Sequence, residues 1–190
     1  MTETKKRLFV AISLPDEILQ QLEELQKKLK RFARDAKWVK PQSIHLTLKF
    51  LGYVDPVKIP AIANSLAKIS NESSSATVQI KGCGFFPNSR RPSVFWTGIE
   101  SNDLEPLQSK IENAMADLGF EKENREFQPH LTLARFRDPH GLMYLAEEAS
   151  KHNNDQFGEF TARSFVLFES ILHREGAEYV RLQEFRLSPQ

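Results

Sequence analysis

The sequence has few cysteines and no long apolar run, and each shortage excludes a class of protein. Cys83 is the single cysteine among 190 residues, so no intrachain disulfide can form, which favours a reducing compartment. Charged residues make up 27% of the chain and interrupt every apolar stretch before it reaches the roughly 20 residues of a membrane-spanning helix. The apolar run after Arg7 continues into Pro15 and a charged segment without a small-residue cleavage site, which predicts a strand rather than a signal peptide. We therefore expect a cytoplasmic protein with no membrane partner.

An excess of charge of either sign is also missing. The 26 basic residues balance 25 acidic ones and leave a net charge of +1, so any polyanion must be attracted by a local cluster. One such cluster, the basic segment, consists of Lys27, Lys28, Lys30, Arg31, Arg34, Lys37 and Lys40. The simpler interpretation is a solvated helix end, because the helix dipole favours cations there. The alternative is a surface for an RNA chain.

The hydrophobic pattern mixes strands and helices without a strict β-α-β alternation. Strands are expected at 7–13, 44–51, 77–83, 93–99, 130–136, 160–172 and 179–187, and helices at 15–34, 59–69, 104–118 and 140–151. This order predicts the α+β class with antiparallel sheets. We expect a single domain over residues 1–190 and a monomer.

The most informative pattern is a tetrapeptide that occurs twice. HLTL stands at 45–48 and returns 85 residues later at 130–133. Each copy has a proline upstream and, downstream, a basic residue followed by phenylalanine. An identical repeat with matching flanks indicates two structurally equivalent lobes, each supplying one histidine and one threonine.

Strand geometry indicates what this spacing achieves. Side chains at i and i+2 share a face of a strand, so His45 and Thr47 point one way while the two leucines point into a core. His130 and Thr132 repeat the arrangement. Two imidazoles that meet at one site suit a general acid and a general base, and two hydroxyls can donate to the oxygens of a phosphate.

Other chemistries find little support in the sequence. A lone histidine is most often structural, but the duplicated His/Thr pair argues against that interpretation. Neither copy contains a second histidine or a carboxylate at metal-ligand spacing, and Cys83 has no partner cysteine. The chain has no Walker loop, no Gly-rich dinucleotide turn and no G-x-S-x-G elbow. We expect no metal and no cofactor.

The paired H-x-T-x motifs resemble those of the 2H phosphoesterase superfamily. The chain as a whole resembles the RNA 2′,3′-cyclic phosphodiesterases, once named 2′-5′ RNA ligases. The segments that carry the resemblance are RLFVAISLP near the start, W-x-x-P-x-x-x-HLTLKFLG at 38–52, RPSVFWTGI, F-x-PHLTLAR at 127–135 and FVLFESIL. The resemblance implies a bilobal α+β fold, with two pseudo-symmetric lobes whose antiparallel sheets line a central cleft and whose helices lie outside.

The resemblance also implies an activity and roles for five residues. The activity is metal-independent hydrolysis of RNA 2′,3′-cyclic phosphate ends, tRNA-like fragments included, to 2′-phosphates, together with a reversible, ATP-independent 2′-5′ RNA ligation. His45 would be the proton donor and His130 the proton acceptor. Thr47, Thr132 and Arg135 would bind the phosphate.

Strand parity raises one question about the basic residues that follow the motifs. Arg135 comes five residues after His130, so regular alternation would turn it to the opposite face, and a bulge is needed to bring it back. Lys49 has the parity of His45 and Thr47 and is expected to face the cleft.

Two other functions stay open at the level of the sequence. One is a nucleotide-binding or RNA-binding module with little turnover. The other is the same chemistry on a small nucleotide. Aromatic side chains that stack on a base would bear on this choice, and Phe9, Phe86 and Trp96 are candidates, although each also fits a core position.

Overall fold

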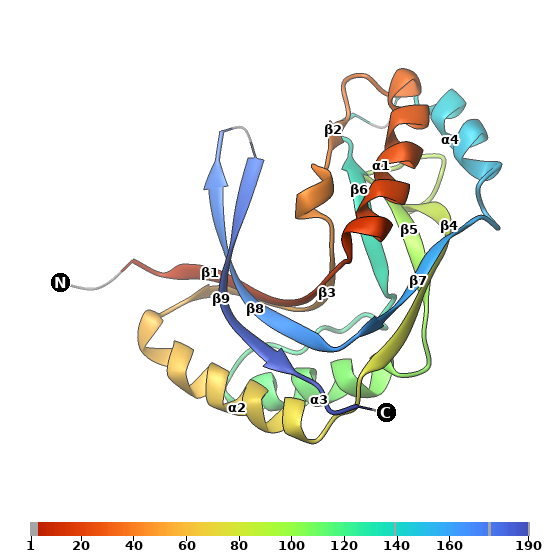
Figure 1. Cartoon of the computed structure of the whole chain (residues 1–190). Coiled ribbons are helices and arrows are strands. Elements are labelled where there is room, and N and C mark those ends of the chain that lie inside the picture. Colours follow the sequence, from red (N-terminus) through yellow and green to blue (C-terminus); the bar gives the residue numbers. More distant parts are fainter. Residues whose placement is uncertain (1–3, 139, 175, 190) are drawn as a thin grey trace.

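The computed structural model describes residues 4–138, 140–174 and 176–189 (Figure 1). Its strands are β1 (Lys6–Ser13), β2 (Lys37–Trp38), β3 (His45–Val54), β4 (Ala76–Phe86), β5 (Val94–Glu100), β6 (His130–Arg135), β7 (Gln156–Ala162), β8 (Ser164–His173) and β9 (Gly176–Arg186). Its α-helices are α1 (Asp16–Leu29), α2 (Ile59–Asn71), α3 (Leu104–Asp117) and α4 (Met143–Ser150). Short 3-10 helices lie at Lys30–Phe32, Pro41–Ser43 and Pro56–Lys58.

The strands form one curled sheet in which every pairing between named strands is antiparallel. Their order is β7-β4-β5-β6-β3-β1-β8-β9, with β2 added beside β6. The first half is β7-β4-β5-β6 and the second half is β3-β1-β8-β9, so that each motif strand lies at the inner end of one half. The expected α+β fold with two antiparallel halves is confirmed, and the halves join in the middle of a continuous sheet.

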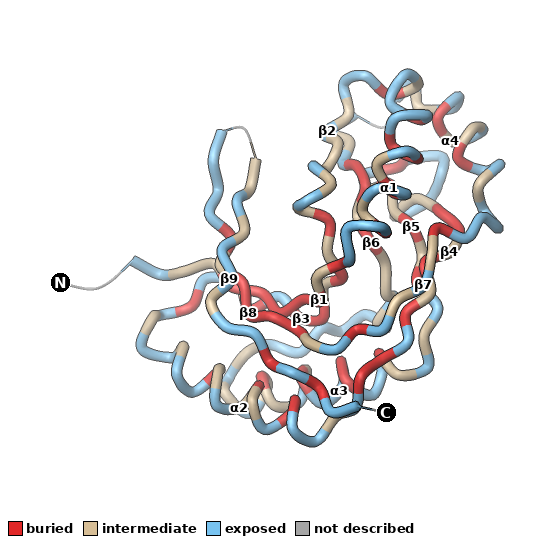
Figure 2. The backbone as a smooth tube through the Cα atoms, viewed as in Figure 1, coloured by how far each residue is buried: buried red, intermediate tan, exposed pale blue. Residues whose placement is uncertain are grey.

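The helices cover the sheet in two pairs. Helices α1 and α4 lie against the first half, and α2 and α3 lie against the second (Figure 1). Helix α1 buries an apolar stripe that includes Ile18, Leu22, Leu25 and Leu29. Figure 2 shows the buried residues gathered along the central strands and the inner sides of the helices. Among the described helices, none has the combined length and apolar character needed to cross a membrane.

One glycine of β7 lies against helix α1. A Cβ on Gly158 of β7 would lie 2.5 Å from Ile18 Cδ1, and the residue has a φ of +127°. The positive φ therefore favours glycine at this position, whereas the end of the Ile18 side chain could move aside.

The single strand expected at 160–172 is wrong. The chain forms β7 up to Ala162 and a separate strand β8 from Ser164. Strand β7 pairs with β4, whereas β8 pairs with β1 and β9 in the other half of the sheet. The sequence has no glycine or proline at this crossover to mark the end of one strand and the start of the next. Only the tertiary pairing separates the two strands.

Candidate functional site

The two motif strands meet at a single residue pair. Leu46 of β3 pairs with Leu131 of β6 in antiparallel register, and both side chains are fully buried in the core. Alternation along each strand turns the neighbouring histidine and threonine to the other side of the sheet. That side, the motif face, therefore carries His45 and Thr47 together with His130 and Thr132, all half-buried.

Both histidine rings are held in the same way. Nδ1 of His45 lies 2.9 Å from the carbonyl oxygen of Ser43, and Nδ1 of His130 lies 2.7 Å from that of Gln128. A carbonyl only accepts, so in the neutral ring Nδ1 carries the proton and donates it. Nε2 of each ring is thereby left as the atom that can take up or release a proton.

The surroundings of both imidazoles favour the neutral form over the protonated one. Burial lowers the pKa of His45 and of His130, and the positive charge of Arg135 lowers the pKa of both further, while the hydrogen bond to the backbone carbonyl opposes the shift. One guanidinium thus acts electrostatically on both rings. Arg135, which the sequence nominates, is close enough to the two histidines to influence each.

A bulge in β6 brings Arg135 to the motif face. Along the regular strand β5, Trp96 pairs with Thr132, Phe95 with Ala134 and Val94 with Arg135, so the register passes over Leu133. Val94 lies two residues from Trp96 on β5, so Arg135 shares the face of Thr132. The bulge that the sequence requires for this residue is present.

The same displacement in β3 overturns the expectation for Lys49. Val10 pairs with Lys49 and Ala11 with Thr47, so the register passes over Leu48. Lys49 therefore turns toward the core, where it is 6% exposed. It forms an ion pair with Glu112 and donates to the carbonyl of Glu121 at 2.6 Å. Lys49 lies outside the motif face because strand parity reverses at a bulge.

Phe50 takes the place in β3 that Arg135 has in β6. Both residues come five positions after the motif histidine, and Phe50 pairs with Phe9 on the motif face. The Phe50 ring is 54% exposed, with the guanidinium of Arg7 5.9 Å from its centre. Phe50 is not among the site residues expected from the sequence, although the aligned repeat HLTLKF and HLTLAR contains the signal.

Aromatic rings flank each histidine. The His45 ring lies 4.8 Å from Phe9 and 5.0 Å, edge to face, from Tyr179. The His130 ring lies 5.0 Å from Phe86, which also contacts Trp96. Phe9 is 1% exposed, so among the nominated aromatic residues it supports His45 rather than offering a surface for a base. The rings restrict the motion of both imidazoles.

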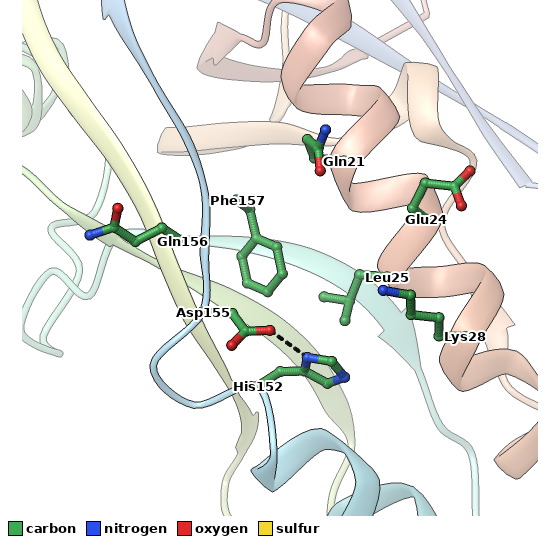
Figure 3. A pocket seen from close by; sticks show the side chains of 8 residues that line it. All are labelled: Gln21, Glu24, Leu25, Lys28, His152, Asp155, Gln156 and Phe157. Carbon is green, nitrogen blue, oxygen red and sulfur yellow. Dashed lines mark hydrogen bonds and ion pairs between the residues drawn. The ribbon is translucent and has the colours of Figure 1, made fainter.

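A metal cluster and a pocket beside α1 are the other candidates for a site outside the motif face. Across 4–138, 140–174 and 176–189, no group of three or more His, Cys, Asp or Glu side chains is arranged to hold a metal ion. Cys83 is buried, and mainly for that reason the pKa of its thiol is raised to about 12. A pocket between α1 and residues 152–157, where His152 contacts Asp155 at 2.6 Å, contains no motif residue (Figure 3).

Comparisons with known proteins agree on one family. The family described as LigT like Phosphoesterase matches residues 12–96 and 99–179. The RNA 2′,3′-cyclic phosphodiesterase of Methanocaldococcus jannaschii is 34% identical over 179 residues, which cover 94% of this chain and 99% of the relative. The protein of the same name from Thermotoga maritima is 37% identical over 132 residues, or 69% of this chain and 70% of the relative.

Solved structures lead to the same family. The crystal structure of TT0787 of Thermus thermophilus superposes with a TM-score of 0.83 and 28% identity, covering 97% of this chain and 99% of the other. The crystal structure of E. coli LigT complexed with phosphate gives a TM-score of 0.74 and 26% identity, with coverage of 98% and 99%. Sequence and structure together place the chain in the LigT-like 2H phosphoesterase family.

Proposed function

We propose that this protein hydrolyses the 2′,3′-cyclic phosphate at the end of an RNA to a 2′-phosphate, without a metal ion. The observation that carries the proposal is the pair of His/Thr motifs on one face of the sheet, with the charge of Arg135 reaching both histidines. Further support comes from relatives named RNA 2′,3′-cyclic phosphodiesterase, identical at 31–37%. The protein acts as a single-domain monomer in the cytoplasm.

The reaction is an in-line attack of water on the cyclic phosphorus. Nε2 of neutral His130 accepts a proton from the water while the new P–O bond forms. The P–O3′ bond breaks, and protonated His45 delivers its Nε2 proton to the leaving O3′. Water is consumed, the phosphate stays on O2′, and each histidine ends in the protonation state from which the other began. General acids and bases of this kind contribute about 10²–10⁴-fold each.

Charge builds up on the non-bridging phosphate oxygens during the attack. The hydroxyls of Thr47 and Thr132 donate to these oxygens, and Arg135 supplies the positive charge. The same ring opening with the 5′-hydroxyl of a second RNA in place of water joins the two RNAs through a 2′-5′ linkage and needs no ATP, because the cyclic ester already stores the required energy. RNA fragments with cyclic phosphate ends, tRNA-like fragments among them, are the substrate class.

The two rings make equivalent hydrogen bonds and therefore have the same tautomer, which does not distinguish the acid from the base. The roles assigned to His45 and His130 are those that the family resemblance implies. The pH profile of single variants tests them. Loss of the acid in His45→Ala removes the alkaline limb of the profile, whereas loss of the base in His130→Ala removes the acidic limb. If His45→Ala instead loses the acidic limb and His130→Ala the alkaline limb, the two histidines exchange roles and the rest of the mechanism is unchanged.

The decisive experiment is hydrolysis of an RNA oligomer ending in a 2′,3′-cyclic phosphate, in EDTA, with identification of the product isomer. Wild-type protein is expected to give the 2′-phosphate, and His45→Ala and His130→Ala each lose about 10²–10⁴-fold in kcat. Turnover of a mononucleotide cyclic phosphate but not of the oligomer would redirect the proposal to a small substrate. Binding without any turnover would indicate a binding module.

A further inference from the structure

Two buried glutamines on different helices donate to equivalent carbonyls in the two motifs. Nε2 of Gln26, on α1, lies 2.9 Å from the carbonyl oxygen of Leu133, and Nε2 of Gln108, on α3, lies 3.5 Å from that of Leu48. Leu133 and Leu48 end the two HLTL tetrapeptides, and both are the residues over which the sheet register passes. A carbonyl at a bulge is displaced from the regular ladder and needs a donor from elsewhere.

The two helices repeat in sequence just as the motifs do. L-E-x-L-Q-x-K followed by leucine or isoleucine stands at 22–29 and again at 104–111, with the glutamine at the same position in each. Helix α1 precedes β3 but contacts the bulge of β6, and α3 precedes β6 but contacts the bulge of β3. Each helix therefore supports the motif strand of the half of the sheet that it covers, which is not the motif strand that follows it in the chain.

The Gln26 amide joins two backbone segments at the site. Its side chain is fully buried, and Nε2 also donates to the carbonyl of Val39 at 2.8 Å. The amide of Val39 donates to the carbonyl of Leu133 at 2.9 Å. Because both neighbours of Nε2 are acceptors, the amide orientation is determined, and Oε1 is left buried without a hydrogen-bond partner in the described part of the chain. Oε1 of Gln26 is unpaired because the side-chain amide is oriented so that Nε2 donates to the carbonyls of Val39 and Leu133.

The residues after the bulge depend on the same contact. Strand β2, which immediately precedes Val39, pairs Trp38 with Ala134 and Lys37 with Arg135. A slip of one residue in β6 would remove the bulge and return Arg135 to the opposite face. Gln26 holds the bulge on one side and the segment after β2 on the other, so it opposes this slip.

We propose that Gln26 is a positioning residue that maintains the β6 bulge and thereby keeps Arg135 on the motif face beside His130 and Thr132. Gln108 has the corresponding role for β3, although its contact with the Leu48 carbonyl is longer. Its Nε2 also donates to Glu112 at 3.2 Å. The link from Gln26 to catalysis rests on the proposed function, because it acts through the residues that bind the phosphate.

The test compares Gln26→Met, which keeps the side-chain length and removes both donors, with two variants of the same helix. Gln21→Met changes an exposed glutamine, and Leu22→Ala removes packing from a fully buried position. In Gln26→Met the dissociation constant for inorganic phosphate is expected to rise on the order of tenfold, because a charge-assisted contact is misplaced. The NMR titrations of His45 and His130 move to higher pH, as they do in Arg135→Gln. Both controls keep the wild-type affinity and titrations, although Leu22→Ala lowers the Tm.

A double variant completes the comparison. Gln26→Met/Arg135→Gln is expected to bind phosphate no more weakly than Arg135→Gln alone, because Gln26 acts through the arginine. If Gln26→Met lowers the Tm but keeps wild-type phosphate affinity and titrations, the proposal is wrong and Gln26 only stabilises the fold. Should Gln26→Met not fold, Gln26→Asn withdraws the amide from the carbonyls and gives the same comparison. Phosphate binding and titration need no turnover, so a failure of the hydrolysis assay would be distinguishable from a failure of this proposal.

Discussion

Leu46 and Leu131 pair across the centre of the sheet and bury their side chains on the same side. Continued in antiparallel register, this pair sets His45 opposite Thr132 and Thr47 opposite His130. The two motifs therefore run in opposite directions away from this pair, each with its histidine and threonine on either side of the leucine. Two apolar residues with no chemistry of their own thereby define the pseudo-two-fold arrangement of the four polar ones.

The pH dependence of the reaction follows from the direction of the histidine shifts. Burial and Arg135 lower the pKa of His45 and His130, so the bell-shaped profile of kcat/KM is expected to centre below the ordinary imidazole value of about 6.5. In Arg135→Gln the cation is gone, both pKa values rise, and the profile moves to higher pH while its maximum falls about 10²–10³-fold. Arg137→Gln, an exposed position two residues on, is the matched control. A profile that stays in place in Arg135→Gln would contradict the electrostatic coupling.

Phe50 is expected to contact the nucleotide at the end of the RNA. It is exposed on the motif face in the place equivalent to Arg135, so a base can stack on its ring. Stacking is worth about 1–3 kcal/mol per base, so Phe50→Ser is expected to raise KM for an RNA oligomer by roughly fivefold or more with little change in kcat. Tyr144→Ser, on helix α4 and 64% exposed, is the control. Steady-state kinetics giving equal effects for the two variants would exclude a specific role for Phe50.

The basic segment is expected to extend the RNA-binding surface from the site. All seven of its cations are exposed, and Lys37 pairs with Arg135 across β2 and β6, so the segment reaches the motif strand. Each phosphate contact with single-stranded RNA contributes about 0.7 to the slope of log K against log salt. Replacing Arg31, Arg34 and Lys37 by glutamine is expected to reduce the slope measured with an RNA oligomer, and Lys122→Gln is expected to leave it unchanged. An unaltered slope in the triple variant would identify the segment as a solvated helix end.

The ion pair of Lys49 and Glu112 is expected to contribute to stability rather than to catalysis. The two side chains are 5% and 12% exposed, so Lys49→Met leaves a buried carboxylate without its cation and lowers the free energy of unfolding by about 3–5 kcal/mol. The double variant Lys49→Met/Glu112→Met recovers most of that loss. Lys6→Met breaks the more exposed pair with Glu169 and costs at most about 1 kcal/mol. Urea unfolding measures all three, and a double variant less stable than Lys49→Met would refute the argument.

The sequence predicted the chemistry of the site better than its geometry. The repeat at 45–48 and 130–133 nominates two histidines and two threonines because strand alternation puts each pair on one face. The need for a bulge before Arg135 follows from the same alternation. Applied to Lys49, that reasoning failed, because the second bulge at Leu48 leaves no trace in the composition of β3.

Other features emerged only from contacts between distant segments. The chain crosses from one half of the sheet to the other between Ala162 and Ser164 without a turn residue to mark it. The repeated L-E-x-L-Q-x-K pattern can be found in the sequence, where it indicates only two similar helices. It does not predict that Gln26 contacts Leu133, which lies 107 residues away.

The sequence by itself determined the fold class, the duplication and the side chains that could act as acid, base and phosphate ligands, because these depend on local periodicity and residue chemistry. The tertiary structure alone decided which motif each helix supports, that Lys49 faces the core, and that Phe50 and Arg135 both turn to the motif face. The physical reason is register: a displacement of one residue in a strand reverses every side chain beyond it, and the displacement is set by hydrogen bonds from other parts of the chain.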